Sequence, residues 1–265
     1  MEGTMIAAGL KQRKESGQKG LIVYLTAGYP DLDATYQAVM AAEAAGADAI
    51  EIGIPFSDPI ADGPVIQKAA TEALKRGVTA PKILELIRRI RRSSSIPLAV
   101  MTYVNTVLHY SPQKFIADFS AAGVAGLIIP DLPMEESGFI QAICREYPME
   151  LISFIAPTSG QDRIAAISKE ASGFLYCISS TGVTGVKRTD YQLVEKIICQ
   201  ASRHTTIPIA VGFGIGSPEV AREAAKYADA VIVGSAVVQR MEKGDVASVR
   251  DFLSGIRREL DRGGL

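Results

Sequence analysis

Eight short apolar runs, separated by segments of helical character, set the strongest limit on how this chain can fold. They are rich in β-branched residues and cover residues 21–26, 47–53, 97–102, 125–130, 150–155, 173–179, 208–213 and 229–234. Most are continuously apolar rather than alternating, which is typical of strands buried on both faces of a parallel sheet. The segments between them are rich in Ala, Glu, Lys, Ile and Leu and predict helices, so the chain consists of repeated strand–helix units.

The length of the chain accommodates these units in one barrel. Eight strand–helix units in 265 residues match the size of a (β/α)8 TIM barrel, and a weak internal repeat (AAGADAIEIG, AAGVAGLIIP, KYADAVIVGS) supports reuse of one unit. A doubly wound open sheet is the alternative, but it needs fewer strands or a second domain, and no linker is evident. We predict a single TIM-barrel domain over residues 1–265, with an additional short amphipathic helix before the first strand.

Composition narrows the classes of function. The chain has 28 basic and 29 acidic residues and a net charge of −1, which argues against a surface for nucleic acid or anionic membranes. We expect Cys144, Cys177 and Cys199 to be reduced core thiols of a cytoplasmic protein. The two histidines lack metal-ligand spacing, so we expect no metal site. The first twenty or so residues have no long apolar run and predict neither a signal peptide nor a membrane span.

A carboxylate interrupts the second apolar run. Ile50 and Ile52 should face the helices, which directs Glu51 into the barrel. Burying a carboxylate is costly and raises its pKa. A buried Lys, Arg or Tyr partner would explain it structurally, but no Lys or Arg falls within a predicted strand. We therefore favour Glu51 as a general acid–base group.

The loop that follows this strand, PFSDPIADGP, carries two more carboxylates. It opens the longest gap between strands, which also holds two predicted helices at about 63–76 and 81–92. Turn chemistry accounts for either aspartate, and Asp62 could also cap the following helix. For Asp58 a turn or surface role is slightly favoured. Asp62 stays open between a turn or capping role and catalysis, because its loop follows the same strand as Glu51 and could fold over the barrel mouth, where the active sites of TIM barrels lie.

Glycine-rich segments follow the last three strands: STGVTG at 180–185, GFGIGSPE at 212–219 and VGSA at 233–236. Glycines after strands seven and eight let backbone N–H groups approach a phosphate, and Ser235 could open a helix there. The small, polar segment after strand six predicts a mobile lid. The residues thus predict a barrel enzyme that acts on a phosphorylated small molecule without a metal.

Seven motifs together resemble one family. They occur in order and at the family's spacing: TAGYPD, EIGIPFSDPIADGPVIQ, MTYVN, IPDLPMEES, STGVTG, GFGI and VGSA. The chain resembles the α subunit of tryptophan synthase over essentially its whole length. The long motif that holds Glu51 and Asp62 is the most specific of the seven.

The resemblance implies a reaction. The family cleaves indole-3-glycerol phosphate to indole and D-glyceraldehyde 3-phosphate, a retro-aldol reaction in tryptophan biosynthesis that needs no metal or organic cofactor. The family's glutamate falls on Glu51, which would protonate the indole ring carbon and help remove the glycerol hydroxyl proton. Its aspartate falls on Asp62, which would hold the indole N–H, and Thr184 would tie the closed lid to Asp62.

The resemblance also implies the binding residues. The phosphate cradle falls on Gly185, Gly214, Gly234 and Ser235. The indole pocket falls on Tyr24, Met101, Tyr103 and Phe213, with Tyr176 near the catalytic carboxylate. From the residues alone, ordinary core packing is the alternative for each of these aromatic side chains.

A partner is implied in the same way. The family pairs with a pyridoxal-phosphate-dependent β subunit in an α2β2 complex that channels indole between the two sites. Pro55, Asp58, Asp131 and Pro133 would face that β subunit. Pyridoxal phosphate is not expected to bind this chain, since no lysine lies in a setting that suggests a Schiff base.

Three other functions remain to be separated from this one. A sugar-phosphate isomerase or another phosphate-binding barrel would carry a different acid–base pair. A stand-alone lyase would release free indole without a partner, and the catalytic motifs do not distinguish it from a subunit. A non-catalytic regulatory subunit would have no need of both carboxylates and all three glycine segments.

Overall fold

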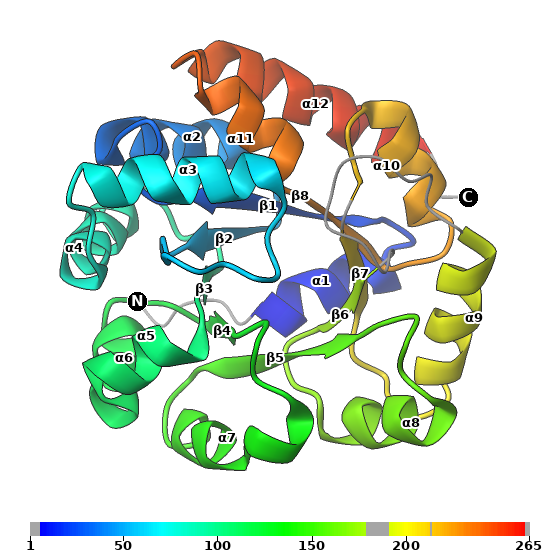
Figure 1. The fold of residues 1–265 in the computed structure, drawn as a ribbon. Helices are drawn as coiled ribbons and strands as arrows, with labels where there is room; N and C mark the ends of the chain where they lie inside the picture. The colour runs from blue at the N-terminus through cyan, green and yellow to red at the C-terminus, as the bar shows by residue number, and fades with distance from the viewer. Residues whose placement is uncertain (1–5, 179–190, 213, 263–265) are drawn as a thin grey trace.

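The strands close into a barrel in the order in which they follow one another along the chain (Figure 1). The computed structural model describes residues 6–178, 191–212 and 214–262. The parallel strands are β1 (Gly20–Thr26), β2 (Ala49–Gly53), β3 (Leu98–Met101), β4 (Gly126–Ile128), β5 (Glu150–Ile155), β6 (Leu175–Ile178), β7 (Ile209–Gly212) and β8 (Ala230–Val233). Pairing of β8 with β1 closes the ring, so the predicted TIM barrel is confirmed. The predicted strands differ from the observed ones by no more than two residues at either end.

Helices surround this barrel, except for the first one, which lies across the centre of the ring (Figure 1). They are α1 (Ile6–Glu15), α2 (Leu32–Ala44), α3 (Pro64–Lys75), α4 (Ala80–Arg91), α5 (Val104–Tyr110), α6 (Pro112–Ala121), α7 (Gly138–Cys144), α8 (Gln161–Glu170), α9 (Tyr191–Ala201), α10 (Pro218–Ala225), α11 (Ser235–Met241) and α12 (Val246–Arg262), with a 3-10 turn at Met134–Glu136. Pro64, Pro112 and Pro218 are the first residues of their helices, where proline's fixed φ and missing N–H are tolerated. The two helices predicted after the second strand are α3 and α4. No helix within the described ranges is long and apolar enough to cross a membrane.

Two apolar layers follow from the alternation of side chains along the strands. Ile50 and Ile52 are fully buried in the outer layer between strands and helices, as predicted. Ala49 belongs to the inner layer, inside the barrel, together with Ile22 and Ala99. Since Glu51 alternates with the two isoleucines, its side chain also enters the barrel.

The predicted N-terminal helix, α1, closes one end of the barrel. Its Ile6 and Leu10 belong to the inner apolar layer, and α1 crosses the centre of the ring in Figure 1. Two strand glycines make room for it. A Cβ at Gly20 would lie 2.6 Å from a Leu10 methyl carbon, and one at Gly126 would lie 2.8 Å from a methyl carbon of Ile6. The opposite end of the barrel, at the carboxyl ends of the strands, is therefore the end that is available for a binding site.

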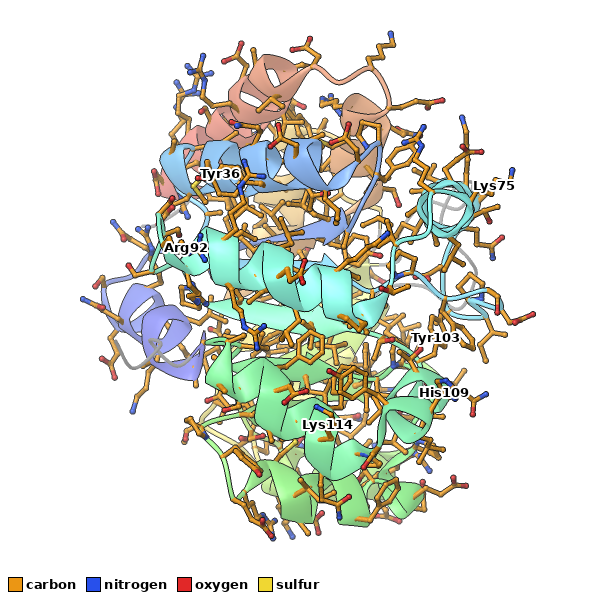
Figure 2. All side chains as sticks on the ribbon, turned by 90° about the vertical axis from the view of Figure 1, so that its left-hand side faces the viewer. Tyr36, Lys75, Arg92, Tyr103, His109 and Lys114 are labelled. Carbon is orange, nitrogen blue, oxygen red and sulfur yellow. The ribbon has the colours of Figure 1, made fainter. Side chains whose placement is uncertain are left out.

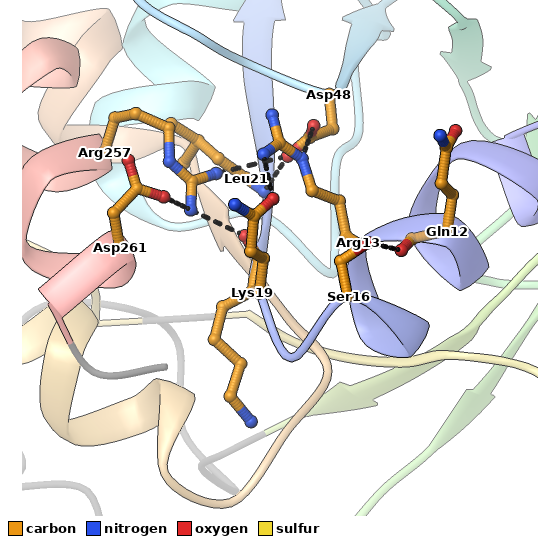
Figure 3. Close-up of polar contacts among 9 residues, drawn as sticks. Gln12, Arg13, Ser16, Lys19, Leu21, Asp48, Arg257 and Asp261 are labelled. Atoms are coloured by element: carbon orange, nitrogen blue, oxygen red, sulfur yellow. Dashed lines mark hydrogen bonds and ion pairs between the residues drawn. The ribbon is translucent and has the colours of Figure 1, made fainter. Parts of the chain in front are cut away.

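Polar contacts fasten this closed end (Figure 3). Asp48, just before β2, accepts hydrogen bonds from Arg13 on α1 at 2.6 Å and from the backbone N–H of Leu21 at 2.8 Å. Arg257 on α12 reaches the same carboxylate at 3.3 Å and donates to the backbone oxygen of Lys19 at 2.8 Å. One carboxylate thereby joins the first and last helices to the start of the sheet.

Glu150 is a buried carboxylate at the closed end. It begins β5, is 5% exposed, and its hydrogen-bond partner is the backbone amide of Ala7 on α1. Its Oε2 atom has no partner among the described residues. Burial raises the pKa of Glu150 to about 7, against an ordinary value of 4.5.

Glu150→Gln should therefore change how stability depends on pH. Because the pKa is raised in the folded state, the Glu150 contribution to stability is full below about pH 4.5 and is lost as the pH rises through about 7. The variant stays neutral, so we expect its free energy of unfolding to exceed that of the wild type by roughly 1–3 kcal/mol at about pH 8, but not at about pH 4. Urea unfolding at both pH values measures this. The exposed Glu146→Gln is the control, and an equal gain at both pH values would contradict the assignment.

The cysteines differ from expectation in one case. Cys144 and Cys177 are buried thiols, and burial raises the pKa of each to about 12. The prediction of a core thiol is wrong for Cys199, which is exposed. On α9 the core-facing positions are held by Val194, Ile197 and Ile198, so the next position, 199, turns outward.

Candidate active site

Glu51 is buried inside the barrel, and within the part of the chain that the structure describes it has no hydrogen-bond partner. It lies in register between Tyr24 on β1 and Ala99 on β3, and it is 1% exposed. Neither carboxylate oxygen has a partner among the described residues, so pairing with a buried Lys or Arg does not explain it. Burial raises the pKa of Glu51 to about 8. A carboxylic acid in this state holds its proton at neutral pH and can donate it.

Asp62 reaches the same region from the loop after β2. Its side chain is mostly buried, and its Oδ2 accepts a hydrogen bond of 3.1 Å from the hydroxyl of Tyr103. Burial raises the pKa of Asp62 to about 6, and the Tyr103 hydrogen bond acts in the opposite direction. The N-cap of α3 is Gly63, with no side-chain cap, so the capping explanation for Asp62 does not hold.

Tyr24 and Tyr176 both lie close enough to Glu51 and Asp62 to interact with the charges of the two carboxylates. Burial raises the pKa values of Tyr24 and Tyr176, and the charges of Glu51 and Asp62 raise both further. Each ring lies over a strand glycine. A Cβ at Gly53 would lie 2.1 Å from the Tyr24 hydroxyl oxygen, and one at Gly212 would lie 2.5 Å from that of Tyr176. Larger residues at these two positions would displace the rings from the site.

A cavity of about 450 Å³ opens beside these groups. Seven of the predicted site residues line it: Tyr24, Asp62, Met101, Tyr176, Gly214, Gly234 and Ser235. Nine further residues complete the described wall: Ala61, Gly63, Val65, Ile66, Ile215, Gly216, Ile232, Ala236 and Gln239. Its size and its mixture of apolar walls with a few polar groups are typical of a small-molecule site.

Two of the predicted catalytic and substrate-binding residues in the described part of the chain, Glu51 and Tyr103, do not line this cavity. The hydroxyl of Tyr103 is occupied by Asp62 and by the N–H of Ala61, which donates to it at 3.0 Å. Phe56 stacks on its ring with centroids 5.0 Å apart. Figure 2 shows Tyr103 at the end of the barrel away from α1, beside His109. Its contacts are those of a residue that holds the Asp62 loop.

Backbone groups form the other side of the cavity. Gly214 has φ +78°, which favours glycine, and Gly234 is the N-cap of α11, whose first residue is Ser235. Three predicted residues, Thr184, Gly185 and Phe213, lie outside the described residues. The lid predicted over 180–185 lies outside them as well.

The predicted partner residues are divided between surface and interior. Asp58 and Pro133 are exposed, whereas Pro55 is buried. Asp131 is half-buried and accepts a hydrogen bond of 2.9 Å from the backbone N–H of Val104, the first residue of α5.

Some residues of the cavity wall were not predicted from the sequence, although for two of them the sequence pattern would have allowed it. Ile232 shares the inward face of β8 with Ala230, and strand alternation could have found it. Gln239 follows Ser235 by one helical turn, so spacing places both on one face of α11. Ile66 and Ile215 needed the path of two loops, for which the sequence carries no periodic signal.

Comparisons with known proteins agree with this geometry. Residues 10–257 match the family model described as "Tryptophan synthase alpha chain". The tryptophan synthase alpha chain of Caldanaerobacter subterraneus is 44% identical over 93% of this chain and 96% of its own length, and that of a Picosynechococcus strain is 42% identical over 97% and 99%.

Solved structures show the same relationship. A structure of Mycobacterium tuberculosis tryptophan synthase superposes with a TM-score of 0.91 at 35% identity, covering 98% of this chain and 99% of that one. The tryptophan synthase subunit alpha of Legionella pneumophila gives 0.88 at 31% identity, covering 97% and 98%. With a family model over most of its length and close relatives over nearly all of it, the chain belongs to the tryptophan synthase alpha chain family.

Proposed function

We propose that this chain cleaves indole-3-glycerol phosphate to indole and D-glyceraldehyde 3-phosphate, with Glu51 and Asp62 as its catalytic groups. The observation that carries the proposal is a pair of carboxyl groups with separated pKa values: Asp62 lines the cavity, and Glu51, inside the barrel, is close enough to Tyr24 and Tyr176 of the cavity wall for its charge to raise their pKa values. Burial raises the pKa of Glu51 to about 8, so this residue is protonated at neutral pH. The pKa of Asp62 is raised only to about 6, so Asp62 is ionised. Two carboxyl groups whose environments separate their pKa values can divide acid and anion roles between them.

The reaction uses this difference in two stages. Glu51 gives its proton to the indole ring carbon that carries the glycerol chain, and positive charge develops on the ring nitrogen. Asp62 accepts the N–H hydrogen bond and stabilises that charge. The Glu51 carboxylate then takes the proton of the adjacent glycerol hydroxyl while the carbon–carbon bond breaks. The bond electrons return to the ring, which leaves neutral indole, an aldehyde and a protonated Glu51.

Tyr24, Met101 and Tyr176 supply the wall for the indole ring in this proposal. At the other side, Gly214, Gly234 and Ser235 present backbone N–H groups and a hydroxyl, the donors that a phosphate requires. Gly185, Thr184 and Phe213 are proposed to complete the phosphate cradle, the lid and the ring pocket, as the family resemblance implies.

Gly234→Asp tests the phosphate side. A Cβ at Gly234 would lie 3.4 Å from the nearest Tyr24 carbon, an ordinary contact, so the fold should tolerate the change. The added carboxylate would repel the phosphate, and we expect KM for indole-3-glycerol phosphate to rise at least about tenfold. Gly234→Ala is the control and should raise KM much less. Steady-state kinetics of both variants decide it, and equal KM values would remove the phosphate from this position.

The partner in this proposal is a tryptophan synthase β subunit in an α2β2 complex. Ile60, in the Asp62 loop, is 76% exposed, and Leu108 on α5 is 48% exposed. Asp58 and Pro133 are exposed as well, and all four residues lie in segments that follow the carboxyl ends of the neighbouring strands β2, β3 and β4. We propose that the β subunit covers these apolar side chains at the open end of the barrel.

Indole release by the purified chain tests the function directly. We expect slow release from indole-3-glycerol phosphate by the chain alone and much faster release with a β subunit added. Fast release without a partner would favour a stand-alone lyase. Release in neither condition would overturn the proposal and return the site to another phosphate-binding barrel.

A further inference from the structure

The side chain of Gln67 holds the loop that carries Asp62. Gln67 lies near the start of α3, and its Nε2 donates hydrogen bonds to the backbone oxygen of Asp62 at 2.9 Å and to that of Pro59 at 3.4 Å. Both acceptors belong to the segment between β2 and α3, residues 54–63, named here the aspartate loop. The helix therefore holds the loop through one side-chain amide.

Tyr103 holds the aspartate loop through other atoms. Its hydroxyl accepts from the N–H of Ala61 and donates to the carboxylate of Asp62. The bonds from Gln67 act instead on the peptide that follows the Asp62 α-carbon. The aspartate is thus fixed both through its carboxylate and through the backbone from which its side chain projects.

Core packing does not account for a glutamine at this position. The core-facing residues of α3 are Ala69, Ala70 and Ala73, whereas Gln67 is exposed. Its own backbone N–H already makes the helical bond to Gly63 at 2.9 Å, so α3 does not need the side chain to form. The backbone hydrogen bonds that join residues of this loop to one another span only two or three positions, from Asp62 N–H to the oxygen of Pro59 at 3.1 Å and from Ile60 N–H to that of Asp58 at 2.9 Å.

We propose that Gln67 is a positioning residue for Asp62: by donating to the carbonyls of Asp62 and Pro59, it sets the backbone from which the aspartate reaches the ring nitrogen of the substrate. This rests on the proposed function of Asp62. Catalysis is sensitive to placement, since a shift of about 1 Å can cost about 10²-fold in rate. Gln67 itself does not line the cavity, so it acts on the rate through Asp62 and not through substrate binding.

Gln67→Glu is the first variant to measure, because it keeps the length of the side chain and removes its N–H donors. We expect kcat for indole release to fall about tenfold, with KM within about twofold of the wild type. Gln67→Lys restores a donor and should recover part of kcat. The matched control is Gln37→Ala, which removes an exposed glutamine from α2 and should leave kcat unchanged.

The outcomes separate positioning from a merely structural role. A fall in stability with unchanged kcat per folded molecule would overturn the proposal, as would a change in KM alone or equal losses in the Glu and Lys variants. Hydrogen exchange of the Ala61 and Asp62 amides gives a readout that needs no activity. If the wild-type chain does not cleave the substrate, the proposed function fails. Faster exchange in Gln67→Glu than in Gln37→Ala would still establish that Gln67 holds the loop, and unchanged exchange would exclude it.

Discussion

Glu51→Gln should abolish cleavage and make the folded protein more stable above neutral pH. The amide has nearly the shape of the acid, but it cannot give a proton to the ring carbon or take one from the glycerol hydroxyl. Removing such a group costs about 10²–10⁴-fold, and because Glu51 acts in both stages we expect at least about 10³-fold in kcat. Indole release at saturating substrate measures this.

The same substitution that removes activity should increase the free energy of unfolding. The raised pKa of Glu51 means that its contribution to stability is full below about pH 4.5 and is lost as the pH rises through about 8. The neutral amide removes this loss, so the variant should gain roughly 2–4 kcal/mol in free energy of unfolding at about pH 9 and nothing at about pH 4.

Glu85→Gln, at an exposed position on α4, is the control and should match the wild type in both measurements. Turnover of Glu51→Gln near the wild-type rate would exclude Glu51 as the acid–base group. A variant that loses activity and also loses stability at both pH values would indicate a structural role instead. If the chain were a non-catalytic regulatory subunit, Glu51→Gln would leave its activation of a partner enzyme unchanged.

The barrel could be predicted from the sequence because its strands are apolar on both faces and its helices are periodic. Those two patterns are local and survive in a list of residues. The position of Glu51 inside the barrel was predictable for the same reason, since a charged residue within an apolar run can be seen in the sequence itself. The strand ends were less certain, because the ladder stops where neighbouring strands no longer pair, and that depends on residues far away in the chain.

The role of Tyr103 could not be predicted from its own segment. The sequence places it after a strand and the family resemblance places it in the indole pocket, whereas the structure directs its hydroxyl to Asp62 and Ala61. The contact joins residues 41 positions apart, and only the path of the aspartate loop brings them together. The contacts of Gln67 could not be predicted for a similar reason. Nothing in the sequence indicates that a glutamine on an exposed helix face donates to carbonyl groups of the preceding loop.

Asp62→Asn should lower kcat by about 10²–10³-fold, with a smaller effect on KM. The asparagine oxygen can still accept the indole N–H and the Tyr103 hydroxyl, so the position and the fold should survive. What is lost is the negative charge opposite the ring nitrogen, whose positive charge appears only as the reaction proceeds. The loss therefore falls on kcat more than on substrate binding. Steady-state kinetics, with the exposed Asp251→Asn on α12 as the control, measure it.

The pH dependence of the same variant identifies the group. Wild-type kcat/KM should fall below about pH 6, where Asp62 takes up a proton, and above about pH 8, where Glu51 loses one, which gives a bell-shaped profile. In Asp62→Asn the acidic limb should disappear, because the neutral side chain no longer titrates, while the limb near 8 stays in place. An acidic limb that persists in the variant would assign it to another group and leave Asp62 with a binding role. Loss of the alkaline limb instead would reverse the assignments of the two carboxyl groups, since the acid would then be the residue in the loop and the anion the one inside the barrel.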